Sequence, residues 1–192
     1  MELHQRTDGG WGSALAGEVI AVHLSTKHEF SKDTAGVIEV RAGQGVAGDA
    51  HAGATVQHLS RMKRDPLLPN LRQVHLIQAE LFDQLAADGF QVRPGDLGEN
   101  ITTVGLDLLS LPTGSALHIG DVELTLTGLR NPCAQINAFA PGLMKRLTPL
   151  ENGEVRFLAG VMSTVAVGGS VSAGHGIHVD LPSGPQRPLE RV

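Results

Sequence analysis

The chain has 192 residues, of which 41% are hydrophobic and 18% are charged, and it contains one cysteine. These values predict one compact domain rather than a disordered chain, and no stretch reaches the roughly 18 apolar residues that a membrane helix requires. Fifteen Lys and Arg against 20 Asp and Glu give a net charge of −5, so the chain has no global positive field. We therefore expect neither nucleic acid nor a membrane to be a main partner.

The cysteine content and the N-terminus indicate a compartment. Cys133 has no second cysteine with which to form an internal disulfide, and the opening residues MELHQRTDGG lack the basic and apolar regions of a secretory signal. We therefore expect a cytoplasmic location, where thiols stay reduced.

The first third of the chain predicts strands separated by polar turns. Residues 1–16 show no periodicity and are expected to form a flexible N-terminal tail. Runs rich in Val, Ile, Leu and Thr predict strands at Glu18–Leu24, Gly36–Arg41 and Gln73–Ile77. Between the last two, Thr55–Leu71 is basic and proline-containing, and we interpret it as a solvated surface insertion.

The middle of the chain contains a predicted helix and a predicted hairpin. Gln78–Asp88 has apolar residues on one helical face and is followed by Gly89, which favours a helix end. Strands are predicted at Ala116–Ile119 and Val122–Thr127. Because only Gly120 and Asp121 separate them, the pattern is typical of a tight hairpin with a glycine-first turn.

The last third predicts a second helix and two more strands. The helix covers Ala134–Leu147 and is expected to break at Pro141-Gly142. Strands are predicted at Val161–Val167 and Ile177–Leu181, followed by a flexible C-terminal tail at 182–192. Many short strands with few helices predict a mostly β fold, an antiparallel barrel or sandwich.

Two motifs invite cofactor or metal interpretations. Gly43–Gly48 matches the dinucleotide fingerprint, but the next residues, Asp49–Gly53, have no apolar helical face, so a nicotinamide site is disfavoured. Nine histidines raise the question of zinc, yet no two are spaced four apart on a predicted helix. A catalytic zinc formed by His51 and distant ligands stays open as an alternative.

Cys133 has a sequence context that favours reactivity. It lies in Gly128-Leu-Arg-Asn-Pro-Cys133, between a predicted strand and a predicted helix. Backbone N–H groups at a helix start and the nearby charge of Arg130 both favour thiolate over thiol. The alternative is that a lone cysteine is a small buried apolar residue.

Two further polar groups are candidate binding elements. The turn-rich loop Arg93–Asn100 carries three charges and an amide and suits an anionic ligand, although local capping of the backbone explains such a loop equally well. Arg156 lies just before a predicted strand, where arginine suits bidentate contact with phosphate. A salt bridge to a neighbouring acid is the alternative for Arg156.

Several of these segments together resemble one family. They are Gly48-Asp-Ala-His-Ala-Gly53, Gly98-Glu-Asn100, Gly128-Leu-Arg-Asn-Pro-Cys-Ala-Gln135 and Gly160-Val161, with Gly174 later. In this order and spacing they are similar to the MOSC domain, named for the C-terminal domain of molybdenum cofactor sulfurase, whose small bacterial members resemble proteins that confer resistance to hydroxylated purine analogues. The resemblance covers residues 17–181 and implies a β-barrel akin to the pyruvate kinase barrel domain.

The resemblance also implies roles for single residues. Cys133 matches the family cysteine that ligates molybdenum or carries a persulfide, and we group His51 and Asp49 with it as candidate catalytic residues. Arg130 and Arg156 are assigned to the phosphate or pterin of the molybdenum cofactor. The remaining candidate cofactor-binding residues, at matching motif positions, are Gly98, Glu99, Asn100 and Gln135. One departure is Gly174-His175, where the family commonly has Gly-Asp.

The implied function is a molybdenum-cofactor enzyme that reduces N-hydroxylated bases or related small-molecule substrates. An alternative is a sulfur carrier that receives a Cys133 persulfide from a pyridoxal-phosphate-dependent cysteine desulfurase. A third is a non-catalytic barrel that binds a partner or metabolite. Since one cysteine cannot hold an iron-sulfur cluster and no flavin motif is recognisable, a reductase would need an electron-donor protein.

Overall fold

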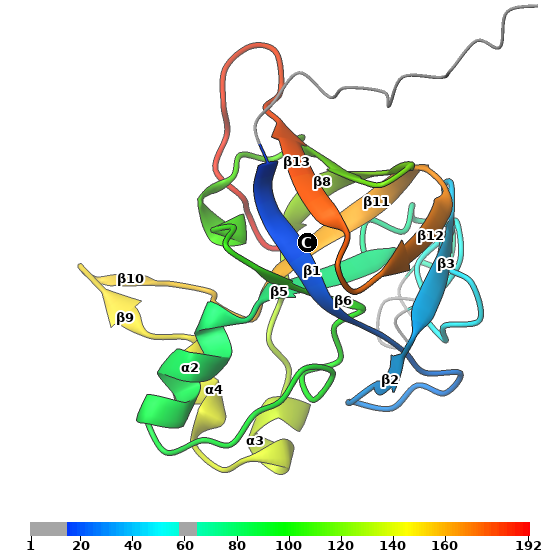
Figure 1. The fold of residues 1–192 in the computed structure, drawn as a ribbon. Coiled ribbons are helices and arrows are strands. Elements are labelled where there is room, and N and C mark those ends of the chain that lie inside the picture. The colour runs from blue at the N-terminus through cyan, green and yellow to red at the C-terminus, as the bar shows by residue number, and fades with distance from the viewer. Residues whose placement is uncertain (1–14, 58–64) are drawn as a thin grey trace, which may run out of the picture.

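The computed structural model describes residues 15–57 and 65–192. Its central feature is a barrel of seven strands in the order β13-β7-β8-β11-β5-β6-β1, closed because β1 also pairs with β13 (Figure 1). The barrel strands are β1 (Leu15–Leu24), β5 (Val74–Gln78), β6 (Ile101–Val104), β7 (Ala116–Ile119), β8 (Val122–Leu129), β11 (Val161–Val167) and β13 (Gly176–Asp180). The predicted mostly β barrel is confirmed.

The barrel is mixed rather than wholly antiparallel, which corrects the sequence-based expectation. β5 and β6 pair in parallel, whereas the other neighbouring barrel strands are antiparallel. Parallel neighbours require a crossover connection, and helix α2 (Glu80–Ala87) lies on the segment that links β5 to β6. The helix predicted at Gln78–Asp88 is therefore the crossover of the barrel.

Short elements are attached to the outside of the barrel. β2 (Asp33–Ala35) pairs with the end of β1, and β12 (Gly169–Ser172), β3 (Val37–Arg41) and β4 (Gly45–Val46) form a three-stranded sheet. β9 (Leu150–Glu151) and β10 (Glu154–Val155) form a hairpin that projects from the molecule (Figure 1). A short 3-10 helix, η1, covers Leu108–Ser110.

Alternation of side chains explains the barrel core. In β8 the alternate residues Val122, Leu124 and Leu126 point inward and are at most 1% exposed. The predicted hairpin before it is confirmed: Ile119 pairs with Val122, and Gly120 has φ +59°, as a glycine-first turn requires.

A second apolar cluster lies beneath the helices. α3 (Gln135–Phe139) and α4 (Leu143–Leu147) flank the predicted break at Pro141-Gly142, and Gly142 has φ +90°. The two short helices and α2 gather at one end of the barrel (Figure 1). Their buried residues meet in one cluster that includes Leu81, Leu85, Ile136, Leu143 and Leu147. This packing fixes the position of the loop that carries Cys133.

The chain ends differ from the predicted tails. Leu15 and Ala16 already belong to β1, and residues 1–14 lie outside the described residues, as do 58–64 of the predicted surface insertion. Residues 182–192 lie along β8: the Leu129 N–H donates to Glu190, the Val192 N–H donates to Leu129, and Leu189 is 8% exposed. The C-terminal segment is held because one leucine completes the barrel core. No helix in the described part of the chain is long and apolar enough to cross a membrane.

Candidate functional site

A narrow pocket of about 80 Å³ lies where the helices meet the barrel, and we call it the thiol pocket. Segments far apart in sequence build it: strands β5 and β11, the loop that precedes β6, and the loops that follow β1, β4 and β8. Its lining residues are Glu29, Phe30, Lys32, His51, Arg72, His75, Gly98, Asn100, Arg130, Asn131, Cys133, Gln135 and Met162.

The fold brings most of the candidate residues from the sequence to this pocket. Six of the nine line it, namely Cys133, His51, Gly98, Asn100, Arg130 and Gln135. Asp49 bonds to three of the lining residues, and Glu99 is fully buried between Gly98 and Asn100. Arg156 lies elsewhere.

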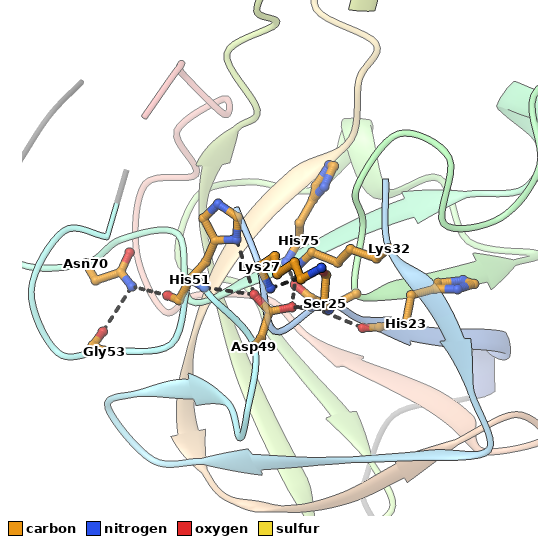
Figure 2. Close-up of polar contacts among 10 residues, drawn as sticks. His23, Ser25, Lys27, Lys32, Asp49, His51, Gly53, Asn70 and His75 are labelled. Atoms are coloured by element: carbon orange, nitrogen blue, oxygen red, sulfur yellow. Dashed lines mark hydrogen bonds and ion pairs between the residues drawn. The ribbon is translucent and has the colours of Figure 1, made fainter. Parts of the chain in front are cut away.

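Asp49 is the hub of the hydrogen bonds behind the pocket (Figure 2). Its Oδ2 atom accepts bonds from the Lys32 ammonium at 2.6 Å, the Asn100 amide at 3.1 Å and the Ser25 N–H at 3.3 Å. Its Oδ1 atom accepts from the His51 N–H at 2.9 Å and lies 3.2 Å from His51 Nδ1. The carboxylate thus ties three loops together and acts as a positioning residue for the side chains that face the pocket.

The charges of Asp49 and Lys32 depend on each other. Both side chains are at most 3% exposed. Burial opposes ionisation of Asp49, but the hydrogen bond to His51 and the charge of Lys32 prevail and hold the pKa of Asp49 well below its usual range. Burial lowers the pKa of Lys32, and the Asp49 carboxylate counteracts this shift. The pair therefore stays ionic only while both partners are present.

Asn100 and His75 join the pocket to the barrel wall. The Asn100 amide donates to the His23 carbonyl, and its Oδ1 atom accepts the His75 N–H at 3.2 Å. His75 Nε2 lies 2.8 Å from the Ala159 carbonyl, so this nitrogen carries a proton. Burial and the charge of Arg130 lower the pKa of His75 well below its usual value, which keeps the ring neutral.

Cys133 and Arg130 occupy one loop after β8. The half-buried Cys133 thiol donates to Gln135 Oε1 at 3.4 Å. The Arg130 guanidinium lies 5.6 Å from the centre of the Phe30 ring. Its Nη1 atom is buried and has no hydrogen-bond partner in residues 15–57 and 65–192. Burial lowers the pKa of Arg130, and the charges of Cys133 and Glu99 counteract this shift. An arginine donor held without a partner beside a thiol suits an anionic ligand.

A buried polar chain lies behind Arg130. Glu99 Oε1 accepts the Gly95 N–H and the Thr102 hydroxyl, and Thr102 Oγ1 lies 3.2 Å from His23 Nε2. Burial raises the pKa of Glu99. Burial and the charge of Lys32 lower the pKa of His23 to about 4. Because its hydrogen bonds run to Gly95 and Thr102 and it is not among the lining residues, Glu99 supports the pocket from behind.

Gly160 is required for the approach of the Arg130 loop to β5. A Cβ atom there would come within 2.6 Å of Ile77 and 2.9 Å of His75 Nε2, and closer still to the Leu76 carbonyl. Gly160 also has φ +90° and accepts the Arg130 N–H at 3.0 Å. Only glycine satisfies both demands.

Gly160→Ala is expected to destabilise the fold more than Gly174→Ala does. Both glycines have φ +90°, but the space around Gly174 is open, so Gly174→Ala has only the backbone cost of about 1 kcal/mol. Overpacking should add about 1–3 kcal/mol at Gly160. Urea unfolding of both variants measures the difference, and equal losses would contradict the steric argument.

Arg156 lies in a second, open hollow of about 650 Å³, which it lines with the β10 residue Val155 and the C-terminal segment. Its guanidinium is exposed and lies 3.6 Å from Glu151 across the β9–β10 hairpin. The salt bridge to a neighbouring acid is thus what the structure contains at this position.

Sequence reasoning missed several residues of the thiol pocket. Lys32 stands in a polar loop with no motif around it, and its role depends on Asp49, 17 residues away. His75 falls inside the strand predicted at Gln73–Ile77, and Arg72 lies between that strand and the predicted surface insertion; neither is a candidate from the sequence, but both line the pocket. Among residues 15–57 and 65–192, no group of three or more His, Cys, Asp and Glu side chains could hold a metal ion.

The family model for the MOSC domain matches residues 50–178, more than half of the chain. The chain belongs to the MOSC domain family. The matched segment contains Cys133 and most of the thiol pocket, whereas Glu29, Phe30 and Lys32 precede it. No curated protein sequence matches this MOSC protein significantly.

Solved structures of bacterial proteins share the fold. The YuaD protein from Bacillus subtilis is 23% identical with a TM-score of 0.70, and the match covers 85% of this MOSC protein and 94% of YuaD. YiiM from Escherichia coli is 18% identical with a TM-score of 0.57, covering 88% and 73% of the two chains. YiiM from Geobacillus stearothermophilus is 15% identical with a TM-score of 0.58, covering 91% and 78%. At these identities the likeness establishes the fold alone.

Proposed function

We propose that this MOSC protein binds the molybdenum cofactor in the thiol pocket, with Cys133 as the protein ligand of molybdenum, and reduces N-hydroxylated bases or related small molecules. Family membership supports cofactor binding. The observation that carries the proposal is that the Cys133 thiol and Arg130 line one pocket, and that the buried Nη1 atom of Arg130 has no hydrogen-bond partner among the described residues. A soft thiolate suits a soft metal centre, and a guanidinium suits the anionic part of a cofactor.

The size and donor chemistry of the site fit such a group. The thiol pocket of about 80 Å³ is too small for a pterin, which needs a site of about 300 Å³ or more. It adjoins an outer hollow of about 550 Å³, with which it shares Glu29, Phe30, Lys32 and Gln135. The outer hollow also contains Phe139, whose ring lies 5.8 Å from that of Phe30. The molybdenum end of the cofactor would fit the thiol pocket beside Cys133, and the planar pterin would fit the outer hollow.

Each residue then has a definable task. Cys133 ligates, Arg130 binds negative charge, and Gln135 holds the thiol direction through its 3.4 Å hydrogen bond. In the neutral tautomer in which His51 Nδ1 donates to Asp49, the Nε2 atom carries no proton and is by its chemistry an acceptor. The bound cofactor supplies the redox chemistry.

Reduction of an N-hydroxyl group needs two electrons and two protons for each water released. A single thiol cannot supply both electrons and return to its starting state, so an electron-donor protein in the cytoplasm completes this proposal. A sulfur carrier loaded by a cysteine desulfurase is the second candidate, because the Cys133 thiol lines the pocket and its one hydrogen bond to a described residue is the 3.4 Å contact with Gln135.

The test is expression of the full chain in a host that makes the cofactor. Wild type is expected to retain molybdenum by elemental analysis and to show pterin fluorescence, and Cys133→Ser is expected to lose the molybdenum. The chain has no second cysteine to serve as a matched variant, so an unchanged unfolding transition is the control.

Three outcomes would contradict the proposal. Cys133→Ser that keeps molybdenum and full reductase activity would remove the thiol from the mechanism. A wild type that retains no molybdenum even when it is made in the cofactor-competent host, and that gains one sulfur atom on Cys133 after incubation with a desulfurase, would indicate the sulfur carrier. Slow alkylation of Cys133, in a protein that neither retains molybdenum nor gains sulfur, would indicate a non-catalytic barrel.

A further inference from the structure

The thiol pocket has the size and charge of a site for a small oxyanion. Its volume of about 80 Å³ compares with about 30 Å³ for one water molecule in the liquid, so it holds an ion of a few heavy atoms. Arg130 lines this space, and its buried Nη1 atom has no hydrogen-bond partner within the part of the chain that the structure describes. A buried donor without an acceptor is unfavourable, and an oxyanion would satisfy it.

The charges around the pocket leave an excess of positive charge. Three cationic residues line it, Lys32, Arg72 and Arg130, against one acidic residue, the exposed Glu29. Asp49 balances Lys32. Glu99, behind Arg130, is a weak counter-charge because burial favours its neutral form. The charge of Arg130 is therefore available to a ligand.

The Cys133 thiol lines the same small space as the Arg130 guanidinium. An oxyanion bound by Arg130 would lie against the cysteine sulfur, which is a nucleophile as thiolate. An S-sulfonate such as thiosulfate combines an oxyanion with a sulfur atom that is reactive towards thiolate, and thiosulfate, with five heavy atoms, is of a size for this volume. Sulfate has the same charged oxygens but no sulfane sulfur to transfer.

We propose that the cofactor-free protein takes sulfane sulfur directly from thiosulfate, with Arg130 as the oxyanion-binding residue. The Cys133 thiolate attacks the sulfane sulfur, a new S–S bond forms on Cys133, and the S–S bond of thiosulfate breaks. The bond's electron pair leaves with sulfite, so Cys133-S⁻ and thiosulfate become Cys133-S-S⁻ and sulfite. No external oxidant or reductant is needed.

Arg130 has two effects on this step. It binds the sulfonate oxygens, which directs the sulfane sulfur towards Cys133, and it stabilises the charge that grows on the departing sulfite. Gln135 is a positioning residue because it bonds the thiol directly. This step is an activity additional to the proposed reduction. One molecule cannot carry out both at the same time, because both use the Cys133 sulfur.

The experiment uses the full chain purified from a host that does not make the molybdenum cofactor. After incubation with thiosulfate, mass spectrometry is expected to find one added sulfur atom on Cys133, with release of one sulfite. Added cyanide should remove that sulfur as thiocyanate and allow steady-state turnover. Cys133→Ser should give neither product. Because no molybdenum takes part, failure here leaves the proposed reductase function untouched.

Variants assign the oxyanion site. Arg130→Met should lower kcat/KM for thiosulfate on the order of tenfold or more, through loss of a charge-assisted hydrogen bond. Arg130→Lys, which keeps the charge, should lose less. Arg41→Met is the matched control, because Arg41 is exposed at the end of β3 and outside the thiol pocket, and it should match wild type.

Sulfate provides a test on wild type that depends on no variant. It should compete with thiosulfate and slow the alkylation of Cys133 by neutral iodoacetamide over the same range of sulfate concentration, because sulfate would occupy the space against the cysteine sulfur. The proposal is overturned if thiosulfate leaves no sulfur on Cys133, if sulfate does not compete, or if folded Arg130→Met and Arg41→Met turn over equally fast.

Discussion

The variant Asp49→Asn is expected to lose about 3–5 kcal/mol of free energy of unfolding, because it leaves the Lys32 ammonium buried without its counter-charge. The loss is compounded by geometry. Both oxygens of Asp49 accept hydrogen bonds, including those from Ser25 and Asn100, and an amide would direct N–H groups at some of these donors. Urea unfolding at neutral pH measures the effect.

Two further variants separate the charge from the site. Glu151→Gln removes a partner of Arg156 at an exposed position and should cost about 0–1 kcal/mol. Lys32→Met in the Asp49→Asn background should recover part of the lost stability, because the unpaired charge is gone. If Asp49→Asn costs no more than Glu151→Gln, the ion pair has no special role in stability.

Acid should lower the free energy of unfolding of the wild-type protein by protonating Asp49 in its ion pair with Lys32. The pKa of Asp49 is depressed in the folded state, so its contribution is fully present above the unfolded pKa of about 3.9. The contribution is lost as pH falls below that value towards the folded pKa. Unfolding followed below pH 4 should therefore show a steep loss that Asp49→Asn lacks.

A separate loss of stability is expected at milder acidity because of His23. Its pKa is about 4 in the folded state against a usual value of 6.5, so the unfolded chain binds a proton in this window and the folded chain does not. Stability is therefore full above pH 6.5 and falls as pH drops towards 4, by on the order of 3 kcal/mol for a shift of this size. Buried His75, whose pKa is also lowered, adds to the slope.

His23→Gln tests this assignment. Gln keeps a donor for Thr102 but does not titrate, so the fall in stability between pH 6.5 and 4 should shrink to the part that His75 contributes. His28→Gln is the matched control at an exposed histidine. Unfolding curves at several pH values are the measurement, and a slope in His23→Gln equal to that of wild type would contradict the assignment.

Elements governed by local chemistry were predictable from sequence. Strands Ala116–Ile119 and Val161–Val167 have the predicted bounds, and the hairpin at Gly120-Asp121 and the break at Pro141-Gly142 follow from residues only a few positions apart. β6 was not predicted as a strand, since it has four residues and its identity depends on parallel pairing with β5. Burial of Leu189 in the core overrode the tail-like composition of the C-terminal segment.

The candidate site shows the same division. Cys133, Arg130 and Gln135 were found because they lie within six residues of one another in one motif. Lys32 and His75 were not, because nothing near them in sequence marks them and their roles come from contacts with Asp49, Ala159 and Arg130. Arg156 had the expected residue type, but the hairpin β9–β10 holds it away from the thiol pocket.

By itself, the sequence determined a mostly β chain with one thiol, placed after a strand and before a short helix, in a pattern that resembles the MOSC family. Composition and local spacing are sufficient for this, because turns, strand alternation and helix ends depend on neighbouring residues. The tertiary structure alone decided which charges meet that thiol. Closure of the barrel brings Lys32, His75 and Arg130 together from distant segments, and the burial of these groups sets their ionisation.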